Sequence, residues 1–217
     1  QRLTTAGLLA VSSNTGSIQI GQKLGKDVLY DYLRKFGIGE STNSKLPGES
    51  AGILHPVKNW SGTSLPTIAF GQGYSLTAMQ ATSVFATIAN NGVRVSPTVI
   101  AGTSDASGNY TPSATRESVR VISADTAQKM RIMMESVVSS KGTAPSAAIP
   151  GYRVAGKTGT AETGIGDGRS FWFTGFAPAD APEVVVAVVI EGSSVEGTAN
   201  AIASPVARAV MEAVLAR

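Results

Sequence analysis

The chain has 217 residues, of which 42% are hydrophobic and 15% charged, so it can form a sizeable core and is neither disordered nor fibrous. Its formal net charge is +3, but Lys and Arg are scattered along the sequence, which argues against a nucleic-acid-binding surface. The absence of Cys excludes disulfides, thiolate catalysis and Cys-ligated zinc, and the single histidine, His55, excludes metal sites built on several histidines.

Hydrophobic spacing predicts that the first part of the chain is helical. A short helix over Leu3–Val11 leads directly into Ser12-Ser13-Asn14. A second helix over Gly25–Phe36 ends at Gly37 as its C-terminal cap. Its predicted apolar face consists of Leu29, Tyr32, Leu33 and Phe36. Residues 37–76 are rich in Gly, Pro, Ser and Asn, and we predict a long loop with short pieces of helix.

Two more helices are predicted in the middle of the chain. Thr77 and Gln80 have the spacing of a capping box and open a helix that stops at Asn90-Asn91-Gly92. Its predicted buried residues are Ala81, Val84, Phe85 and Ile88. Ser123 caps the next helix, which ends before Gly142. Its predicted core residues, with methionine as ordinary packing, are Ala127, Met130, Met134, Val137 and Val138. Between the two helices we predict a short strand over Arg94–Ile100 and an exposed hairpin or loop over residues 102–118.

The pattern then changes to strands, at Tyr152–Ala161, Phe171–Ala177 and Glu183–Ile190, joined by turns short enough for antiparallel neighbours. The last strand is apolar at every position from Val184 to Ile190, so helices are expected on both of its faces. A final helix over Ala199–Leu215 is predicted to have Pro205 in its first turn or at a kink. The apolar residues predicted in register on it are Ile202, Val206, Val210 and Val214.

These elements predict the α+β class: an antiparallel sheet flanked by helices, with an adjoining helical lobe. We place the lobe at about residues 1–145 and the sheet with its C-terminal helix at about 146–217, as parts of one incomplete domain. The sheet has room for more strands than this chain supplies.

Two short motifs carry the chemistry. Ser12-Ser13-Asn14 follows a helix, and Lys157-Thr158-Gly159, followed by Thr160, lies on a strand. Each triplet alone is also compatible with an ordinary polar helix end or an edge strand near a bend. Together and in this order they resemble the penicillin-binding protein and serine β-lactamase superfamily.

The resemblance extends along essentially the whole chain, and division-type class B penicillin-binding proteins are the most similar. The further matching segments are Leu46-Pro47-Gly48-Glu49-Ser50, Gly71 to Thr77, Val154 to Glu162 and the strand from Trp172 to Pro178. The resemblance implies a membrane-anchored peptidoglycan D,D-transpeptidase that acts on the extracytoplasmic face of the bacterial cytoplasmic membrane. It implies stem peptides ending in D-Ala-D-Ala and β-lactam antibiotics as ligands, division or elongation proteins as possible partners, and no cofactor, metal or nucleic acid.

The residue types suit the implied roles. Lys157 supplies a fixed positive charge, and the hydroxyls of Thr158 and Thr160 can bind a substrate carboxylate beside it. Gly159 lets a substrate backbone approach the strand, and the Thr160 N–H can point at the oxyanion. On the other motif, Ser12 can relay a proton to the leaving group. Asn14 can hold the substrate amide and the family's catalytic lysine, whose pKa the charge of Lys157 would lower.

The family's nucleophile is absent from this chain. It lies in a Ser-x-x-Lys motif, and none of the lysines here has Ser three residues earlier. We therefore expect the chain to be the C-terminal portion of the domain and to be inactive alone, with the nucleophile, the early strands and the membrane anchor upstream of Gln1. No apolar run approaches the roughly 20 residues of a membrane-spanning helix.

Two other functions stay open at this point. A serine β-lactamase would need a base for hydrolysis of the acyl-enzyme, and Glu40 and Glu49 are the acids in the loop region. A non-enzymatic β-lactam-sensing or binding domain would lack Ser-x-x-Lys upstream. His55 is expected to be a surface or turn residue. The Gly-rich loop Thr163–Ser170, with Asp167 and Arg169, can form a cleft wall or a plain hairpin loop.

Overall fold

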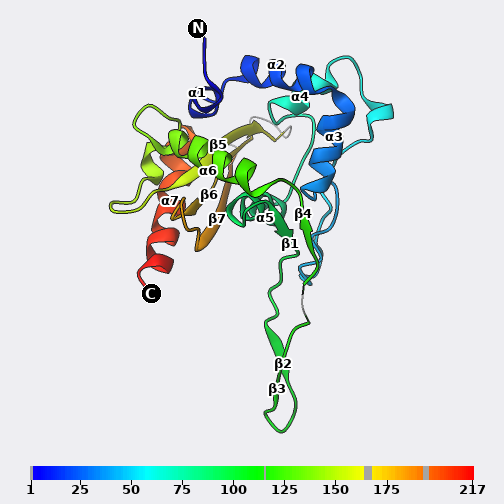
Figure 1. Ribbon diagram of the computed structural model, residues 1–217, viewed down its shortest axis with the longest axis vertical. Coiled ribbons are helices and arrows are strands. Elements are labelled where there is room, and N and C mark those ends of the chain that lie inside the picture. The colour runs from blue at the N-terminus through cyan, green and yellow to red at the C-terminus, as the bar shows by residue number, and fades with distance from the viewer. Residues whose placement is uncertain (1, 115, 164–167, 193–195) are drawn as a thin grey trace.

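Helices dominate the first two-thirds of the chain, and one long helix closes it after the sheet (Figure 1). The structure is a computed structural model that describes residues 2–114, 116–163, 168–192 and 196–217. The helices are α1 (Thr5–Ala10), α2 (Asn14–Leu24), α3 (Lys26–Lys35), η1 (Val57–Asn59), α4 (Ser64–Ala69), α5 (Ala78–Ala89), α6 (Ala124–Val138), η2 (Pro145–Ala147) and α7 (Ala199–Leu215).

Hydroxyl side chains cap the N-termini of several of these helices. Ser123 Oγ accepts a hydrogen bond from the Thr126 N–H at the start of α6. At the start of α5, Thr77 and Gln80 form the predicted capping box in both directions. The same mechanism starts α2, because Ser13 Oγ accepts from the Gly16 N–H. Such caps satisfy backbone donors that have no partner within the helix. Helix α2 was not predicted from the sequence.

Helix α3 ends as the sequence predicts, but one residue of its predicted apolar face is exposed. Gly37 has a φ of +89°, and the N–H groups of Gly37 and Ile38 donate to the carbonyls of Arg34 and Leu33. This closure requires a left-handed residue, which glycine adopts without steric cost. Tyr32, in contrast, is 43% exposed, with the Lys35 ammonium 4.9 Å from the centre of its ring.

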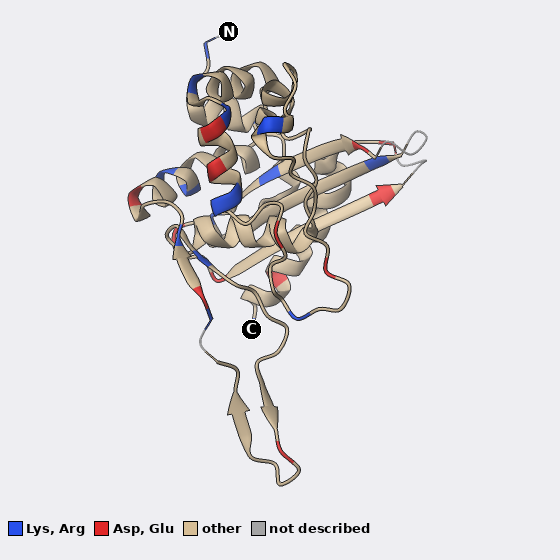
Figure 2. Ribbon diagram, turned by 90° about the vertical axis from the view of Figure 1, so that its right-hand side faces the viewer, with Lys and Arg blue, Asp and Glu red and all other residues tan. Residues whose placement is uncertain are grey.

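Two small antiparallel pairs of strands lie outside the main sheet. Strand β1 (Val93–Val95) pairs with β4 (Ser118–Arg120), so the predicted strand over Arg94–Ile100 is shorter than expected, and β4 was not predicted. Strands β2 (Gly102–Ser104) and β3 (Tyr110–Pro112) form the predicted hairpin. Figures 1 and 2 show this hairpin standing away from the rest of the molecule.

The main sheet has the order β5-β6-β7 and is antiparallel, as predicted. Its strands are β5 (Ala155–Glu162), β6 (Arg169–Ala177) and β7 (Val184–Gly192). Phe173 and Phe176 are three positions apart on β6 and therefore point to opposite faces. Phe173 packs in a cluster with Ala207 and Met211 of α7. Phe176 packs in another with Ile88 of α5 and Met134 of α6. Helices thus cover both faces of the sheet. Helix α6 packs against β5.

The buried side of α7 is formed mainly by small residues, and most of the apolar residues predicted in register lie outside it. Its fully buried residues include Ala203, Ala207 and Met211, whereas Val206, Val210 and Val214 are 45%, 43% and 40% exposed. Alanines let the helix axis approach the sheet closely, and the larger valines then remain on the outer side. Pro205 lies inside the helix and beyond its first turn.

Candidate active site

Strand β5 presents its motif on two faces. It pairs with β6 along one edge, and its other edge has no strand partner among the described residues. Because side chains alternate along a strand, Lys157 shares the α5/α6 face with Ala155, and Thr158 and Thr160 lie on the α7 face. The motif therefore offers an ammonium group and hydroxyl groups on the two sides of an open strand edge.

Two packed helices, α1 and α6, hold Ser12 next to this strand. Helix α6 packs on β5 and α1 packs on α6, where Ser136 Oγ donates to the Ala6 carbonyl at 3.0 Å. Ser12 follows α1 with a φ of +51°, which turns the chain into α2. Lys157 Nζ donates to Ser12 Oγ at 2.7 Å. The two motifs, 145 positions apart in the chain, thus meet in space.

The Lys157 ammonium is half-buried and has no carboxylate partner in the described part of the chain. Besides Ser12, it donates to the Thr158 carbonyl at 2.9 Å. Burial lowers the pKa of Lys157 from 10.5 to about 8. Both contacts are to neutral oxygens, so its charge is not cancelled locally and remains available for an anion.

The other two residues of the helix-end motif have different places. Ser13 is the N-cap of α2, and its hydroxyl oxygen accepts a hydrogen bond from the Gly16 N–H. Asn14 is the first residue of α2 and is exposed. No hydrogen bond between the Asn14 amide and Lys157 occurs within the described ranges. The structure thus joins Ser12 to Lys157 but does not bring Asn14 into that contact.

The remaining motif residues on β5 have distinct surroundings. Thr158 Oγ1 lies 2.7 Å from Thr143 Oγ1, a contact that the sequence does not signal because Thr143 belongs to no motif. Thr160 is exposed. A Cβ on Gly159 would lie 3.3 Å from Trp172 Cβ, so a side chain there would press against the neighbouring strand.

The two loop-region acids and His55 lie in other contacts. Glu49 accepts hydrogen bonds from the hydroxyls and N–H groups of the loop that precedes it. These bonds, that of the Thr42 hydroxyl first, lower the pKa of Glu49 to about 2. Glu40 forms an ion pair with Arg34. His55 is exposed, as expected, and its carbonyl accepts from the Trp60 indole at 2.8 Å.

The predicted loop between β5 and β6 is only partly described. Asp167 lies outside the described residues, and Arg169 is an exposed residue at the start of β6, paired in register with Glu162. Phe173 is fully buried in the core. Trp172 is half-buried, and its indole N–H donates to Ser170 Oγ.

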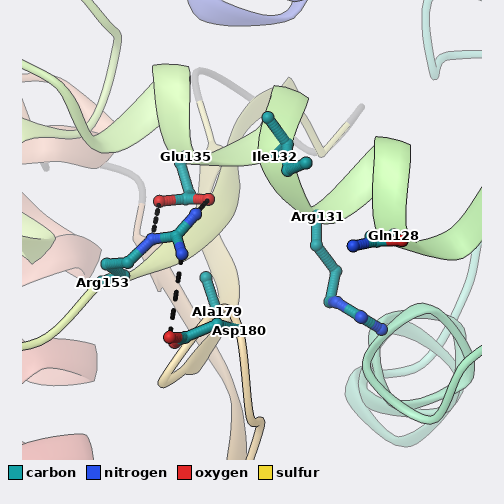
Figure 3. Close-up of a pocket in the computed structure, with 7 residues that line it drawn as sticks. All are labelled: Gln128, Arg131, Ile132, Glu135, Arg153, Ala179 and Asp180. Carbon is teal, nitrogen blue, oxygen red and sulfur yellow. Dashed lines mark hydrogen bonds and ion pairs between the residues drawn. The ribbon is translucent and has the colours of Figure 1, made fainter.

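A cavity of about 100 Å³ lies away from these motifs (Figure 3). Arg153, which precedes β5, pairs with Glu135 at 2.7 Å and with Asp180 at 3.7 Å. Arg131 points toward the end of α5, where it donates to Asn91 Oδ1 at 2.9 Å. The charged groups are thus engaged with the protein, and the volume is below the roughly 300–1,000 Å³ of ligand pockets.

The described residues offer no group of three or more Asp, Glu or His side chains that could hold a metal ion. Nor does any helix in the described ranges have the length and apolar character needed to cross a bilayer. Figure 2 shows Lys and Arg spread over several elements and interspersed with acidic residues. The groups described at the two motifs are the Lys157 ammonium, the hydroxyls of Ser12 and Thr158, and the Thr158 carbonyl.

Comparison with known proteins gives consistent matches. The family model "Penicillin binding protein transpeptidase domain" matches residues 1–212. Penicillin-binding protein PbpB of Mycolicibacterium smegmatis is 40% identical, over 93% of this chain and 34% of its own length. Peptidoglycan D,D-transpeptidase FtsI of Escherichia coli is 34% identical, over 98% of this chain and 36% of its own length. The chain thus spans about a third of these curated relatives.

The fold also matches solved structures. The crystal structure of penicillin binding protein 3 from Mycobacterium tuberculosis complexed with aztreonam superposes with a TM-score of 0.91. The sequences are 37% identical, and the match covers 99% of this chain and 51% of that chain.

Proposed function

Because this chain belongs to the penicillin-binding protein transpeptidase domain family, we propose that it forms part of a division-type peptidoglycan D,D-transpeptidase. The observation that carries the proposal is the 2.7 Å contact between Lys157 Nζ and Ser12 Oγ, which brings the two motifs into one site. The α+β fold and the relatives named above support it. The helical part, residues 1–145, and the sheet part, residues 146–217, would form the two walls of the cleft.

The reaction needs a serine nucleophile, which we place in a Ser-x-x-Lys motif of the complete protein. Its oxygen would attack the carbonyl between the two D-Ala residues of a stem peptide, and the C–N bond would break as terminal D-Ala leaves. An amine of a neighbouring stem would then displace the serine from the acyl-enzyme. The 217 residues alone lack this motif, so we propose that they are inactive without it.

On the helix side of the cleft, Ser12 would relay the proton that the departing amine takes up. Lys157 hydrogen-bonds the Ser12 oxygen, and this contact leaves the Ser12 proton free to move. Asn14 would hold the substrate amide and the catalytic lysine. Its exposed position at the start of α2 leaves its amide accessible to a ligand.

On the sheet side, the exposed edge of β5 would bind the substrate end. Thr158 and Thr160 would donate to its carboxylate next to the charge of Lys157. The absence of a side chain at Gly159 would let the substrate backbone approach, and the Thr160 N–H would stabilise the oxyanion. A donor of this type typically contributes about 10²–10³ in rate.

The same site would bind β-lactams and acylate on the same serine. Complexes of a similar protein with aztreonam and ampicillin support this assignment. We propose that the complete protein is anchored in the cytoplasmic membrane with this domain outside it. Division or elongation proteins would be its partners, and it would need no cofactor.

The carboxylates that a serine β-lactamase reading would require are engaged elsewhere. Glu40 pairs with Arg34, and Glu49 is held by Ser41, Thr42 and Ser44. Neither contacts Lys157 or Ser12 in the described part of the chain. This arrangement favours transfer to an amine over hydrolysis by a loop carboxylate.

The test is product analysis with the complete protein, given glycan strands that carry pentapeptide stems. We expect cross-linked stem dimers that have lost one D-Ala, detected by mass spectrometry, and an acyl-enzyme with penicillin that persists. Rapid turnover of nitrocefin without cross-linking would favour a β-lactamase. A stable penicillin adduct without cross-linking would favour a sensing domain, and either result would contradict the proposal.

A further inference from the structure

The hydroxyl of Thr143 contacts the β5 motif from outside the two motifs. Thr143 lies in the connection between α6 and η2, and its Oγ1 is 2.7 Å from Thr158 Oγ1. That distance is normal for a hydrogen bond between hydroxyls. Both residues are half-buried, so they are partly protected from competing water.

The connection that carries Thr143 is firmly held. The Ala144 N–H donates to the Val137 carbonyl at 2.8 Å, and Ala144 is fully buried. A Cβ on Gly142 would lie 2.1 Å from the Val137 carbonyl oxygen, so only glycine permits this close passage. The next residues are fixed as well, because the Ser146 N–H donates to Asn200 Oδ1 of α7 at 2.9 Å. Thr143 therefore offers its hydroxyl from a backbone with little freedom.

The direction of this hydrogen bond decides what Thr158 can do. A hydroxyl has one proton to donate and two lone pairs to accept with. If Thr143 donates to Thr158, the single proton of Thr158 is left for an anion at the strand edge. Hydrogen bonds arranged in such a chain polarise and strengthen one another. If Thr158 donated to Thr143 instead, it would have no proton left for a carboxylate.

We infer that Thr143 is a positioning residue, which donates to the Thr158 hydroxyl and so turns the Thr158 proton toward the substrate carboxylate. The inference rests on the proposed function, because it assigns the carboxylate of a stem peptide or a β-lactam to Thr158. The inference assigns a role to a residue that belongs to neither motif. The sequence around Thr143 indicates only that a helix ends there.

The experiment compares two ligands on the complete protein: benzylpenicillin and its methyl ester, which lacks the carboxylate charge. Thr143→Val removes the hydroxyl and keeps the shape, and Thr143→Ser restores the hydroxyl. Thr82→Val is the matched control, because the exposed Thr82 hydroxyl donates to the Ala78 carbonyl of its own helix. Acylation rates are followed by intact-protein mass. The ratio of the two ligands' rates within one variant does not depend on the folded fraction.

We expect Thr143→Val to slow acylation by benzylpenicillin about three- to tenfold, through weaker binding, and to leave the ester unaffected. Thr143→Ser should regain most of the rate, and Thr82→Val should match the wild type. Equal slowing of both ligands, or no slowing of either, would overturn the inference. A wild-type protein that neither ligand acylates would instead refute the proposed function.

Discussion

At the scale of single residues, the protonation of Lys157 is the most sensitive feature of the site. Burial disfavours the charged form and lowers its pKa to about 8, and no described carboxylate opposes this effect. The group is therefore charged below about pH 8 and largely neutral above it. A carboxylate bound beside Lys157 should lose its positively charged partner as the pH rises through about 8.

We predict that the apparent affinity for benzylpenicillin, taken from the concentration dependence of acylation, falls about tenfold between pH 7 and pH 9. A group with a pKa near 8 is about nine-tenths charged at the first pH and about one-tenth at the second. Lys157→Arg should abolish this decline, because arginine stays charged throughout the range. A wild-type affinity that does not change with pH, or an equal decline in the Arg variant, would contradict this role for the charge.

At the scale of elements, one buried side chain ties α5 to the long loop region. Gln80 is 1% exposed. Its amide nitrogen donates to the carbonyls of Glu40 and Ala51, both at 2.8 Å, and its oxygen accepts from the Thr77 N–H. The capping box of α5 thus also anchors the loop, which has few strands or helices of its own to hold it.

We predict that Gln80→Ala lowers the free energy of unfolding by about 2–3 kcal/mol, because it leaves buried backbone carbonyls and one N–H without partners. The measurement is urea denaturation of the complete protein, followed by a probe in the transpeptidase domain. Gln19→Ala, at an exposed position of α2, is the control and should change stability by less than about 0.5 kcal/mol. Equal effects of the two changes would show that the Gln80 contacts do not stabilise the fold.

Elements with clear end signals and strong periodicity were predicted well from the sequence. The capping residues Thr77 and Ser123 and the closing Gly37 fix their helix ends by local hydrogen bonds, which the sequence specifies directly. Helix α2 was missed because Gly16 and Gly21 are poor helix formers and its apolar stripe is weak. The buried side of α7 could not be assigned from the sequence, because alanines and valines both follow helical spacing and only packing on the sheet decides between them.

The site was predicted in part. Ser12 and Lys157 belong to motifs whose order along the chain is informative, and the structure brings the two residues into contact. Thr143 has no such signal, because its contact with Thr158 depends on how the connection after α6 folds back over the sheet. Long-range contacts of this kind depend on tertiary structure and leave no local pattern.

At the scale of the whole molecule, the cleft depends on elements from both ends of the chain. Helix α1 near the N-terminus is held on α6, and α6 lies on β5, so Ser12 is positioned by the sheet it faces. On the far side of the sheet, β7 has no strand partner on its outer edge among the described residues. The exposed valines of α7 lie on the outer side of the neighbouring helix. Both features agree with the expectation from the sequence that this sheet has room for further strands.

The central claim is that Ser12 and Lys157 act together in one acyl-transfer site, and a double-mutant cycle tests it most directly. The second-order rate constant of acylation by fluorescent penicillin is measured for the complete protein, for Ser12→Ala, for Lys157→Ala and for the double variant. We predict losses of about 10²–10⁴-fold for each single change with unchanged melting temperatures, and a double variant within about threefold of the slower single one. Losses that multiply in the double variant, or single variants that react at the wild-type rate, would contradict the account.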